Sequence, residues 1–376
     1  MVLGSLSSAL RRRSCELVWL VCFLQVSVIL FYSHRSLDPP WGQNQQDDPS
    51  IQNQQDDPSI QNQQENTAKR NQDRPATPPR GEEAGEPGDK GQNPRGEAVG
   101  PGGKELQQCP GTAPLLVGPL RVEFSSPVKE ELIKKENPAL QPGGRFRPRD
   151  CVAQQKVAII IPFRNREEHL KFWLYYLHPI LQRQQLDYGV YVVNQDGDAT
   201  FNRAKLLNVG YAEALKDYDY DCFVFSDVDL IPMDDRNTYR CFSQPRHLSV
   251  SMDKFGFRLP YNQYFGGVSS MSKEQFLKIN GFPNNYWGWG GEDDDIFNRL
   301  SSRGMSISRP SGDVGKCRMI RHQRDKKNEP NPQRFNRIAH TRDTMSSDGI
   351  SSLSYSLLKT EKRDLYTWIS VDVGKP

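Results

Sequence analysis

The sequence predicts an α/β domain on a mostly parallel sheet, placed behind an N-terminal membrane anchor and a polar stem. Strand-like apolar runs alternate with helical patterns after residue 150, and nearly all the aromatic residues follow residue 108. Such alternation is typical of a parallel sheet covered by helices. A mean hydropathy of −0.73 excludes a polytopic membrane protein. Lys and Arg number 49 against 46 Asp and Glu, so bulk charge does not favour nucleic-acid binding.

The start of the chain has the pattern of a signal anchor. Arg11–Arg13 precede Leu17–Tyr32, an apolar run that would be short for an average bilayer but suits a thin secretory-pathway membrane. A cleaved signal peptide is the alternative, but no pair of small residues follows the run as a cleavage site. The arginines predict a cytoplasmic tail over residues 1–16 and a lumenal remainder.

Residues 33–108 have the composition of a disordered stem. The nonapeptide QNQQDDPSI occupies Gln43–Ile51, is repeated at Gln52–Ile60 and begins again at Gln61. Pro, Gly, Gln and charged residues dominate the rest of the stem, and such a segment cannot bury enough apolar surface to offset the loss of chain entropy. Two repeats are too few for a stacked solenoid. We therefore expect a solvated tether in front of residues 109–376.

The elements of the large domain follow from hydrophobic periodicity. The β-branched run before Pro162 is typical of a strand buried on both faces, and the helix after it repeats apolar residues on one face. The predicted order is strand Lys156–Ile161, helix Glu167 to about Gln185, strand Tyr188–Val193, helix Phe201–Leu215 and strand Cys222–Phe225. A ligand of such a sheet lies at the carboxyl ends of the strands.

Regular elements become sparser toward the C-terminus. Ser272 and Gln275 predict a capping box that opens a short helix, which stops near Asn280-Gly281. The carboxylates of Glu292–Asp295 suit the N-terminus of another helix. Regular signals are few after residue 303, and Gln323–Arg337 is predicted to be a mobile loop.

Two aspartates directly after the third predicted strand are metal-ligand candidates. Asp227 and Asp229 are two residues apart, which in an extended chain places both on the same side of the carboxyl edge. A divalent cation between a carboxylate and a diphosphate would hold the leaving group. The alternative is a pair of turn or capping carboxylates, because the D-x-D pattern is common.

The stretch Trp287–Gly291 and the four carboxylates after it suggest carbohydrate chemistry. Aromatic faces stack on sugars, and glycines allow a loop to open and close over a substrate. A neighbouring carboxylate could serve as general base for a sugar hydroxyl. Successive helical side chains point about 100° apart, so the four carboxylates cannot all serve one site. A solvated helix N-terminus is the alternative, but it leaves the two tryptophans unexplained.

Three further groups of residues leave alternatives open. Arg164 and Arg166 follow the first strand. Their guanidinium groups are suited to binding a phosphate, whereas positive charge is unfavourable at the N-terminus of the helix that follows. Met319 and His322 are three residues apart, but methionine is a soft metal ligand, and spacing alone favours structural roles for both.

The cysteines beyond the anchor are Cys109, Cys151, Cys222, Cys241 and Cys317. Five is an odd number, so at least one is unpaired or joined to another chain.

Four stretches carry a resemblance to a known family. Phe201–Gly210, Asp227–Asp229, Trp287–Asp295 and Asn328–Arg334 occur in this order and together resemble the β-1,4-galactosyltransferases. The resemblance runs from about Leu120 to the C-terminus and excludes the stem. It implies a type II Golgi membrane protein with a lumenal GT-A domain, which is a Rossmann-like nucleotide-sugar-binding fold. The implied reaction moves galactose from UDP-galactose to O4 of terminal N-acetylglucosamine on glycoproteins or glycolipids, with inversion.

The resemblance also assigns roles. Mn²⁺ would be bound by Asp229, Met319 and His322, and Asp293 would be the general base. Trp289 would close over donor and acceptor, and Tyr264 would crowd C2 of the donor and favour galactose over N-acetylgalactosamine. The nucleotide sugar would also contact Pro162, Phe163, Arg164, Asn165, Arg166, Phe201, Asn202, Arg203, Val228, Asp229, His322, Gln323, Arg324 and Asp325. The acceptor would contact Gly291, Glu292, Asp293 and Asp294, with Arg334, Phe335 and Ile338 around its N-acetyl group.

By the same resemblance, Cys109 pairs with Cys151, Cys222 pairs with Cys241, and Cys317 stays free.

Two other functions compete with transfer of galactose. A non-catalytic carbohydrate-binding or adhesion protein could keep the pocket, and a related transferase could use UDP-N-acetylgalactosamine, although Tyr264 argues against it. The sequence leaves open the cellular acceptors, the oligomeric state, release of a soluble form by stem cleavage, and α-lactalbumin as a partner near Phe335 and Ile338.

Overall fold

The computed structural model describes residues 106–376, and the predicted anchor and stem lie outside this range. Within it, no helix combines the length and the apolar character needed to cross a membrane.

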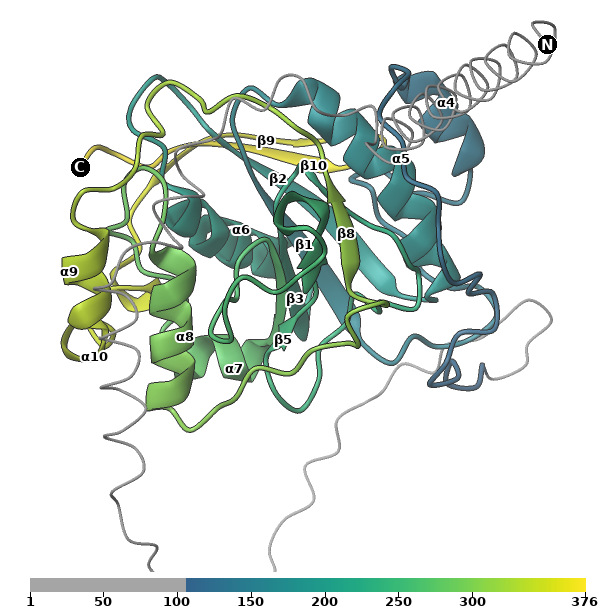
Figure 1. Cartoon of the computed structure of the whole chain (residues 1–376). Coiled ribbons are helices and arrows are strands. Elements are labelled where there is room, and N and C mark those ends of the chain that lie inside the picture. The colour runs from purple at the N-terminus through teal and green to yellow at the C-terminus, as the bar shows by residue number, and fades with distance from the viewer. Residues whose placement is uncertain (1–105) are drawn as a thin grey trace, which may run out of the picture. The chain divides into compact units, whose positions relative to one another are not determined.

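The central element is a seven-stranded sheet in the order β5-β7-β3-β1-β2-β10-β9, and a second sheet has the order β4-β8-β6 (Figure 1). The helices are α4 (Glu130–Glu136), α5 (Glu167–Arg183), α6 (Arg203–Asp217), α7 (Lys273–Lys278), α8 (Glu292–Ser302), α9 (Arg334–Ala339) and α10 (Thr341–Thr344), with 3-10 turns at Asp253–Phe255 and Ile350–Ser352. The strands are β1 (Lys156–Phe163), β2 (Asp187–Gln195), β3 (Cys222–Ser226), β4 (Leu230–Pro232), β5 (Arg246–His247), β6 (Ser251–Met252), β7 (Val268–Ser272), β8 (Lys316–Met319), β9 (Ser356–Lys362) and β10 (Thr367–Asp372).

The main sheet has a parallel centre and antiparallel edges. β1 pairs in parallel with β2 and β3, and β10 pairs in parallel with β2. The pairs of β7 with β3, of β5 with β7, and of β9 with β10 are antiparallel. The three predicted strands are therefore confirmed as its core, while the expectation of a mostly parallel sheet holds only for the centre.

Alternate residues of β1 enter two different cores, as the period of a strand requires. Ile159 and Ile161 belong to the cluster that contains Trp173 of α5, whereas Ala158 and Ile160 belong to the cluster of α6. Each of these side chains is buried. Helices thus cover both faces of the sheet, which explains why the strand is apolar at every position.

β1 continues past Pro162, where the sequence analysis ends it. Proline has no N–H to donate to a neighbouring strand, so a sheet tolerates it where one neighbouring strand is absent. β1 pairs with β3 only up to Ile160, while its pairing with β2 runs to Phe163. At Pro162, β1 therefore has one neighbouring strand rather than two. The strand extends to Phe163, directly before Arg164.

The C-terminal third contains more structure than predicted. β8 pairs with β4 and β6, and the hairpin of β9 and β10 extends the main sheet. α9 begins at Arg334, so the expectation of a loop through Arg337 is wrong for its last residues. Figure 1 shows α8, α9 and α10 together at one end of the molecule, and these helices contact one another.

Candidate active site

The turn after β3 gives the two aspartates of the D-x-D pattern different partners. Asp227 accepts a hydrogen bond from Arg203 Nε at 2.7 Å, and its amide donates to the carbonyl of Gly267 at 3.1 Å. The buried Asp229 places Oδ2 3.1 Å from His322 Nε2. β3 ends at Ser226, so the two aspartates lie in the turn after it, and the charge of Asp229 acts on Asp227.

An ionic cluster surrounds His322 beside the carboxyl end of β1. Arg166 Nη2 lies 2.9 Å from His322 Nδ1 and 2.5 Å from Asp325 Oδ1. The hydrogen bond to Asp229 raises the pKa of His322. Arg166, His322 and Asp325 are all predicted donor-side residues, and the structure brings them together with Asp229.

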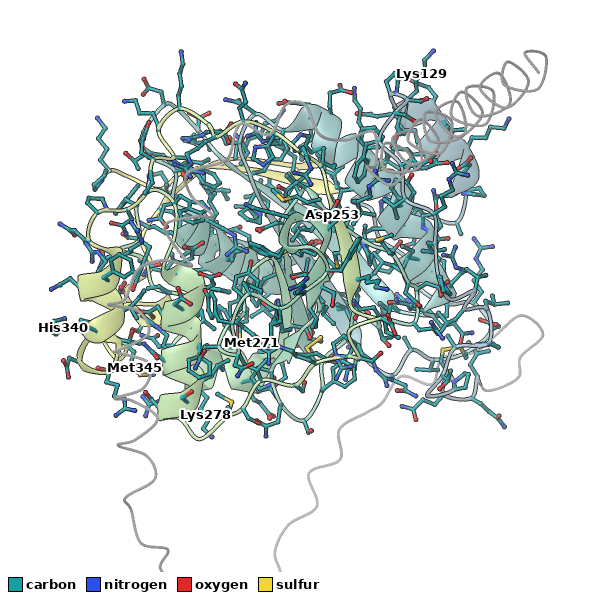
Figure 2. All side chains as sticks on the ribbon, viewed as in Figure 1. Lys129, Asp253, Met271, Lys278, His340 and Met345 are labelled. Atoms are coloured by element: carbon teal, nitrogen blue, oxygen red, sulfur yellow. A yellow bond between two sulfur atoms is a disulfide. The ribbon has the colours of Figure 1, made fainter. Side chains whose placement is uncertain are left out.

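The three predicted metal ligands occupy adjoining backbone positions. Met319 pairs in register with Leu230, and Ile320 N donates to the carbonyl of Asp229 at 2.8 Å. The amide of Met319 donates to Oδ1 of Asp253 at 2.9 Å, and Asp253 is labelled in Figure 2. The carboxylate of Asp229 and the imidazole of His322 suit a divalent cation such as Mn²⁺, whereas a thioether is a soft third donor. Residues 106–376 contain no cluster of three His, Cys, Asp or Glu side chains suited to a metal.

Arg203 connects this donor side to the start of α8. Asn202 caps α6 by accepting from Lys205 N at 2.9 Å, which fixes Arg203 at the first position of that helix. The Arg203 guanidinium bonds Asp227, and its Nη1 lies 3.5 Å from Glu292 Oε1. Burial lowers the pKa of Arg203, but the negative charges of Asp227 and Glu292 have the larger combined effect, so its pKa is raised.

The four carboxylates of α8 point to four different places, as the helical angle predicts. Glu292 faces Arg203, Asp294 accepts from Tyr261 Oη at 2.8 Å, and Asp295 accepts from Arg299 Nε at 2.6 Å. They are buried or half-buried, so the alternative of a solvated helix N-terminus is wrong. The chain reaches this helix through Gly291, whose φ of 94° favours glycine.

Asp293 and Tyr264 meet around Gly266. A Cβ on Gly266 would collide with Asp293 Oδ2 and lie 2.8 Å from the hydroxyl oxygen of Tyr264. Only glycine leaves room for both side chains at this point. The predicted base and the predicted donor-selecting tyrosine are therefore neighbours.

Burial perturbs the titration of this group. Burial raises the pKa of Asp293, although the charge of Arg203 opposes the shift. Burial and then the charge of Asp293 raise the pKa of Glu292 to about 7 and hold that of Asp294 well above its usual range. Burial, followed by the charge of Asp293, also raises the pKa of Tyr264. Buried carboxyls with raised pKa values are typical of acid–base sites.

The tryptophan loop is joined to the segment after β8. Gly288 N donates to the carbonyl of Phe201 at 2.8 Å, and Trp289 N donates to that of Glu329 at 2.9 Å. Asn331 N donates back to the carbonyl of Trp289 at 2.9 Å. The guanidinium carbon of Arg324 lies 5.4 Å from the centre of the Trp289 ring. These predicted donor contacts thus belong to one assembly of two loops.

Arg164 contacts this assembly through backbone carbonyls. Its guanidinium donates to the carbonyl of Ala199 at 2.6 Å and to that of Lys326 at 3.2 Å, and it lies over the ring of Phe201. Burial lowers its pKa. In this structure Arg164 joins loops, and the anion contact proposed for it stays a prediction.

Four of the predicted acceptor residues meet between α8 and α9, whereas Glu292 and Asp294 contact Arg203 and Tyr261 instead. A Cβ on Gly291 would lie 2.9 Å from Arg334 Cβ and 3.3 Å from Ile338 Cδ1. The Arg334 guanidinium carbon lies 4.3 Å from the centre of the Phe335 ring. Gly291, Arg334, Phe335 and Ile338 therefore form one surface beside the start of α8.

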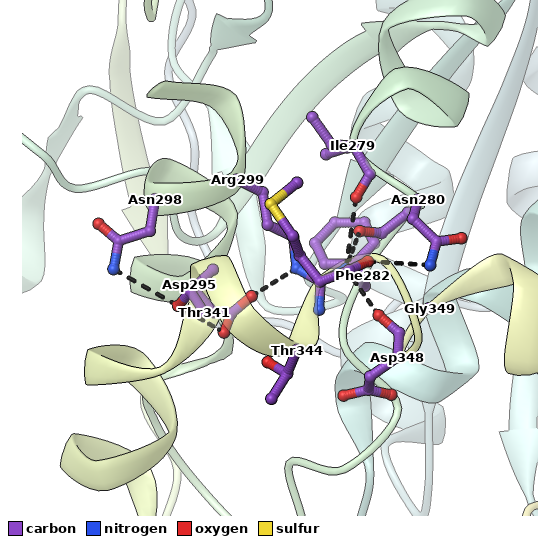
Figure 3. Close-up of polar contacts among 12 residues, drawn as sticks. Ile279, Asn280, Phe282, Asp295, Asn298, Arg299, Thr341, Thr344, Asp348 and Gly349 are labelled. Atoms are coloured by element: carbon purple, nitrogen blue, oxygen red, sulfur yellow. Dashed lines mark hydrogen bonds and ion pairs between the residues drawn. The ribbon is translucent and has the colours of Figure 1, made fainter. Parts of the chain in front are cut away.

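A polar network inside the domain holds α8 in place. Arg299 is fully buried, and besides Asp295 it donates to the carbonyl of Asp348 at 2.8 Å. Asp295 also accepts from Thr341 Oγ1 at 2.9 Å (Figure 3). It accepts from Tyr286 Oη at 3.0 Å as well. The network ties α8 to α10 and fixes the direction of the turn that carries Asp293.

Both disulfides implied by the resemblance are formed. Cys109 is bonded to Cys151 and Cys222 to Cys241. Cys317 is free and buried, and burial raises its pKa to about 12. Gly266 and Asp253 were not predicted from the sequence. For Gly266, the adjacent pair Gly266-Gly267 shortly after Tyr264 was a signal in the sequence.

Two family models match the chain. Residues 109–242 match the N-terminal region of glycosyl transferase group 7, and residues 246–323 match the N-terminal domain of galactosyltransferase. β-1,4-Galactosyltransferase 1 of Homo sapiens is 73% identical over 271 residues, which are 72% of this chain and 68% of the relative. β-1,4-Galactosyltransferase 2 of Mus musculus is 62% identical over 278 residues, covering 74% of this chain and 75% of the relative.

A solved structure has the same fold. The β-1,4-galactosyltransferase 7 of Drosophila, crystallised as a mutant with manganese, UDP-Gal and xylobiose, superposes with a TM-score of 0.52. It is 30% identical, and the match covers 59% of this chain and 95% of that one. The GT-A-like mixed α/β architecture is therefore shared.

Proposed function

Because this chain belongs to the β-1,4-galactosyltransferase family, we propose that it transfers galactose from UDP-galactose to O4 of terminal N-acetylglucosamine. The observation that carries the proposal is the double contact of Arg203. It bonds Asp227, in the same turn as Asp229, and approaches Glu292, the neighbour of Asp293. This double contact supports a donor-side pair and a half-buried carboxylate base at one edge of the sheet.

We assign the base to Asp293. It accepts the proton of the O4 hydroxyl as that oxygen attacks C1 of galactose, while the bond from C1 to the UDP oxygen breaks. This single displacement inverts the configuration at C1 and needs no nucleophile from the protein. Burial raises the pKa of Asp293, and a base with a raised pKa binds the proton more readily near neutral pH.

We assign the divalent cation to Asp229, Met319 and His322. When bound there, Mn²⁺ would neutralise charge on the departing diphosphate. Arg166, which is paired with Asp325, lies against Nδ1 of His322 and restricts the orientation of that ring. The Drosophila relative with manganese and UDP-Gal supports a metal of this kind.

The remaining contacts fall on two sides of Asp293. On the donor side, Tyr264 limits the space at C2 of the sugar and Trp289 covers it. The other proposed donor contacts are Pro162, Phe163, Arg164, Asn165, Phe201, Asn202, Arg203, Val228, Gln323 and Arg324. On the acceptor side, Gly291, Glu292 and Asp294 contact the N-acetylglucosamine ring. Arg334, Phe335 and Ile338 receive its N-acetyl group. The xylobiose complex of the Drosophila relative supports a glycan as acceptor.

The cellular setting is a separate proposal. Arg11–Arg13 and the apolar run Leu17–Tyr32 support a single-pass type II protein of the Golgi membrane, with residues 109–376 in the lumen. α-Lactalbumin is a proposed partner at the surface of Phe335 and Ile338, where it would redirect transfer to glucose.

The test is a transfer assay with the purified protein, UDP-galactose and N-acetylglucosamine, run with Mn²⁺ and with EDTA. We expect a β1-4-linked disaccharide and released UDP in the presence of Mn²⁺, and neither with EDTA. Binding of UDP-galactose without any product would overturn the proposal in favour of a carbohydrate-binding protein.

A further inference from the structure

The segment Asn262–Gly267 lies between the donor side and the base. Tyr264 supplies the proposed donor-selecting ring, and Gly266 packs against Asp293 Oδ2. The carbonyl of Gly267 accepts from the amide of Asp227 at 3.1 Å and from Arg203 Nη2 at 3.5 Å. A shift of this backbone would therefore move groups on the donor side and groups next to the base.

Arg309 holds the segment before and at Tyr264. Its Nη2 donates to the carbonyl of Asn262 at 2.8 Å and to that of Tyr264 at 2.9 Å. The side chain is half-buried, and burial lowers its pKa. Within residues 106–376 it makes no ion pair, so its donors are directed to neutral acceptors. Such a charge stays buried because its hydrogen bonds offset the desolvation.

His247 holds the segment after Tyr264. It is fully buried, and its Nε2 lies 2.9 Å from the carbonyl of Gly266, which can only accept. Nε2 therefore carries the proton, and Nδ1 is left to accept from Arg309 Nε at 3.4 Å. Ser249 Oγ donates to the same carbonyl at 2.9 Å. The backbone is thus fixed on both sides of the tyrosine.

The ring of Tyr264 is enclosed by edge-to-face contacts. His247 lies 5.4 Å from it between ring centres, Tyr261 lies 5.4 Å away and Phe255 6.1 Å away. The hydrogen bonds of its backbone and the three ring contacts together restrict where the Tyr264 ring can lie. That position decides how much space is left for a substituent at C2 of the donor.

We propose that Arg309 and His247 are positioning residues that set donor selectivity by fixing Tyr264 and Gly266. The inference rests on the proposed function. Neither residue touches the reacting atoms, and both act through the backbone of the segment Asn262–Gly267. When the carbonyls of Asn262 and Tyr264 lose their donor, the segment relaxes, the ring moves, and an acetamido group at C2 is admitted.

The test is Arg309→Met, which keeps an unbranched apolar stem and removes the guanidinium donors. The readout is the ratio of kcat/KM for UDP-N-acetylgalactosamine to that for UDP-galactose, which overall stability does not move. We expect this ratio to rise about tenfold, because a displacement near 1 Å is enough for such effects. Arg309→Lys, which keeps the charge and a donor, should give a smaller rise and serves if Arg309→Met does not fold. Arg145→Met is the matched control, since Arg145 is also half-buried but bonds Asp187 at the opposite ends of the strands.

The same change in a Tyr264→Leu background tests the route. If Arg309 acts through the ring, Arg309→Met should alter the ratio less than about twofold once the ring is absent. An unchanged ratio in Arg309→Met, or an equal rise in the Arg145→Met control, would overturn the inference. The ratio of dissociation constants for the two sugar nucleotides is measured in parallel without an acceptor. It tests the inference even if the wild-type protein transfers nothing, an outcome that would instead refute the proposed function.

Discussion

Tyr264 controls the choice of donor because its ring occupies the space next to Gly266 and Asp293. Tyr264→Leu should raise the ratio of kcat/KM for UDP-N-acetylgalactosamine to that for UDP-galactose by roughly 10- to 100-fold, a range expected when one steric contact is removed. Competition between the two donors in one assay measures this ratio. Tyr261→Leu removes one of the three rings packed on Tyr264 but leaves Tyr264 itself, so it should alter the ratio less. A preference unchanged by Tyr264→Leu would contradict the steric role.

Glu292 should make folding stability depend on pH. Its pKa is about 7 in the folded chain because of burial and then the charge of Asp293, against an ordinary value of 4.5. A carboxyl whose pKa is raised by folding stabilises the folded state below pH 4.5, and this contribution is lost as the pH rises through 7. Glu292→Gln should remove that part of the dependence. Urea unfolding at about pH 5 and about pH 7.5 without metal or donor measures it, and equal pH dependence in both proteins would contradict it.

Single residues were predictable where local sequence fixes their place. Asp229 follows a strand and Asp293 begins a helix, so both could be placed at the site from the sequence. The partner of Asp227 could not, because Arg203 reaches it from α6. The carbonyl contacts of Arg164 likewise come from residues far along the chain, which no local pattern encodes.

Among the elements, α8 depends on the ion pair of Arg299 with Asp295. Arg299→Met would leave Asp295 buried without its cation and should lower the free energy of unfolding by about 3–5 kcal/mol. Chemical denaturation measures the loss. Arg303→Met, at an exposed position just after the same helix, should change stability by less than about 0.5 kcal/mol. Equal effects of the two changes would contradict the importance of the network.

The elements that the sequence predicted all have apolar faces, although β10, which is mostly buried, was not predicted. β1, β2, β3 and α5 lie within two residues of their expected ends because they pack on the two cores. β9 was missed because its side chains are almost all exposed, and α9 because it has six residues with none buried. Their positions depend on the neighbouring β10 and α8, so tertiary contacts and not local pattern define them.

For the molecule as a whole, the disulfides close loops that the unfolded chain would otherwise leave free. Cys222 and Cys241 are 19 residues apart and Cys109 and Cys151 are 42 apart. Replacing both cysteines of a bridge by serine should cost about 3 kcal/mol for the first and about 4 kcal/mol for the second, from loop entropy. Thermal unfolding with free Cys317 kept in both variants compares them. An unchanged melting temperature would contradict this contribution.

The most direct measurement compares Asp293→Asn with the wild-type protein in two assays at once. Binding of UDP-galactose with Mn²⁺ should stay within a few-fold, because the donor contacts lie on the other side of Gly266. Transfer to N-acetylglucosamine should fall roughly 10³-fold, as expected when a general base is removed. Asp294→Asn, next in the helix but bonded to Tyr261, should lose less. Transfer near the wild-type rate in Asp293→Asn would contradict the role of Asp293 as the base and with it the proposed mechanism.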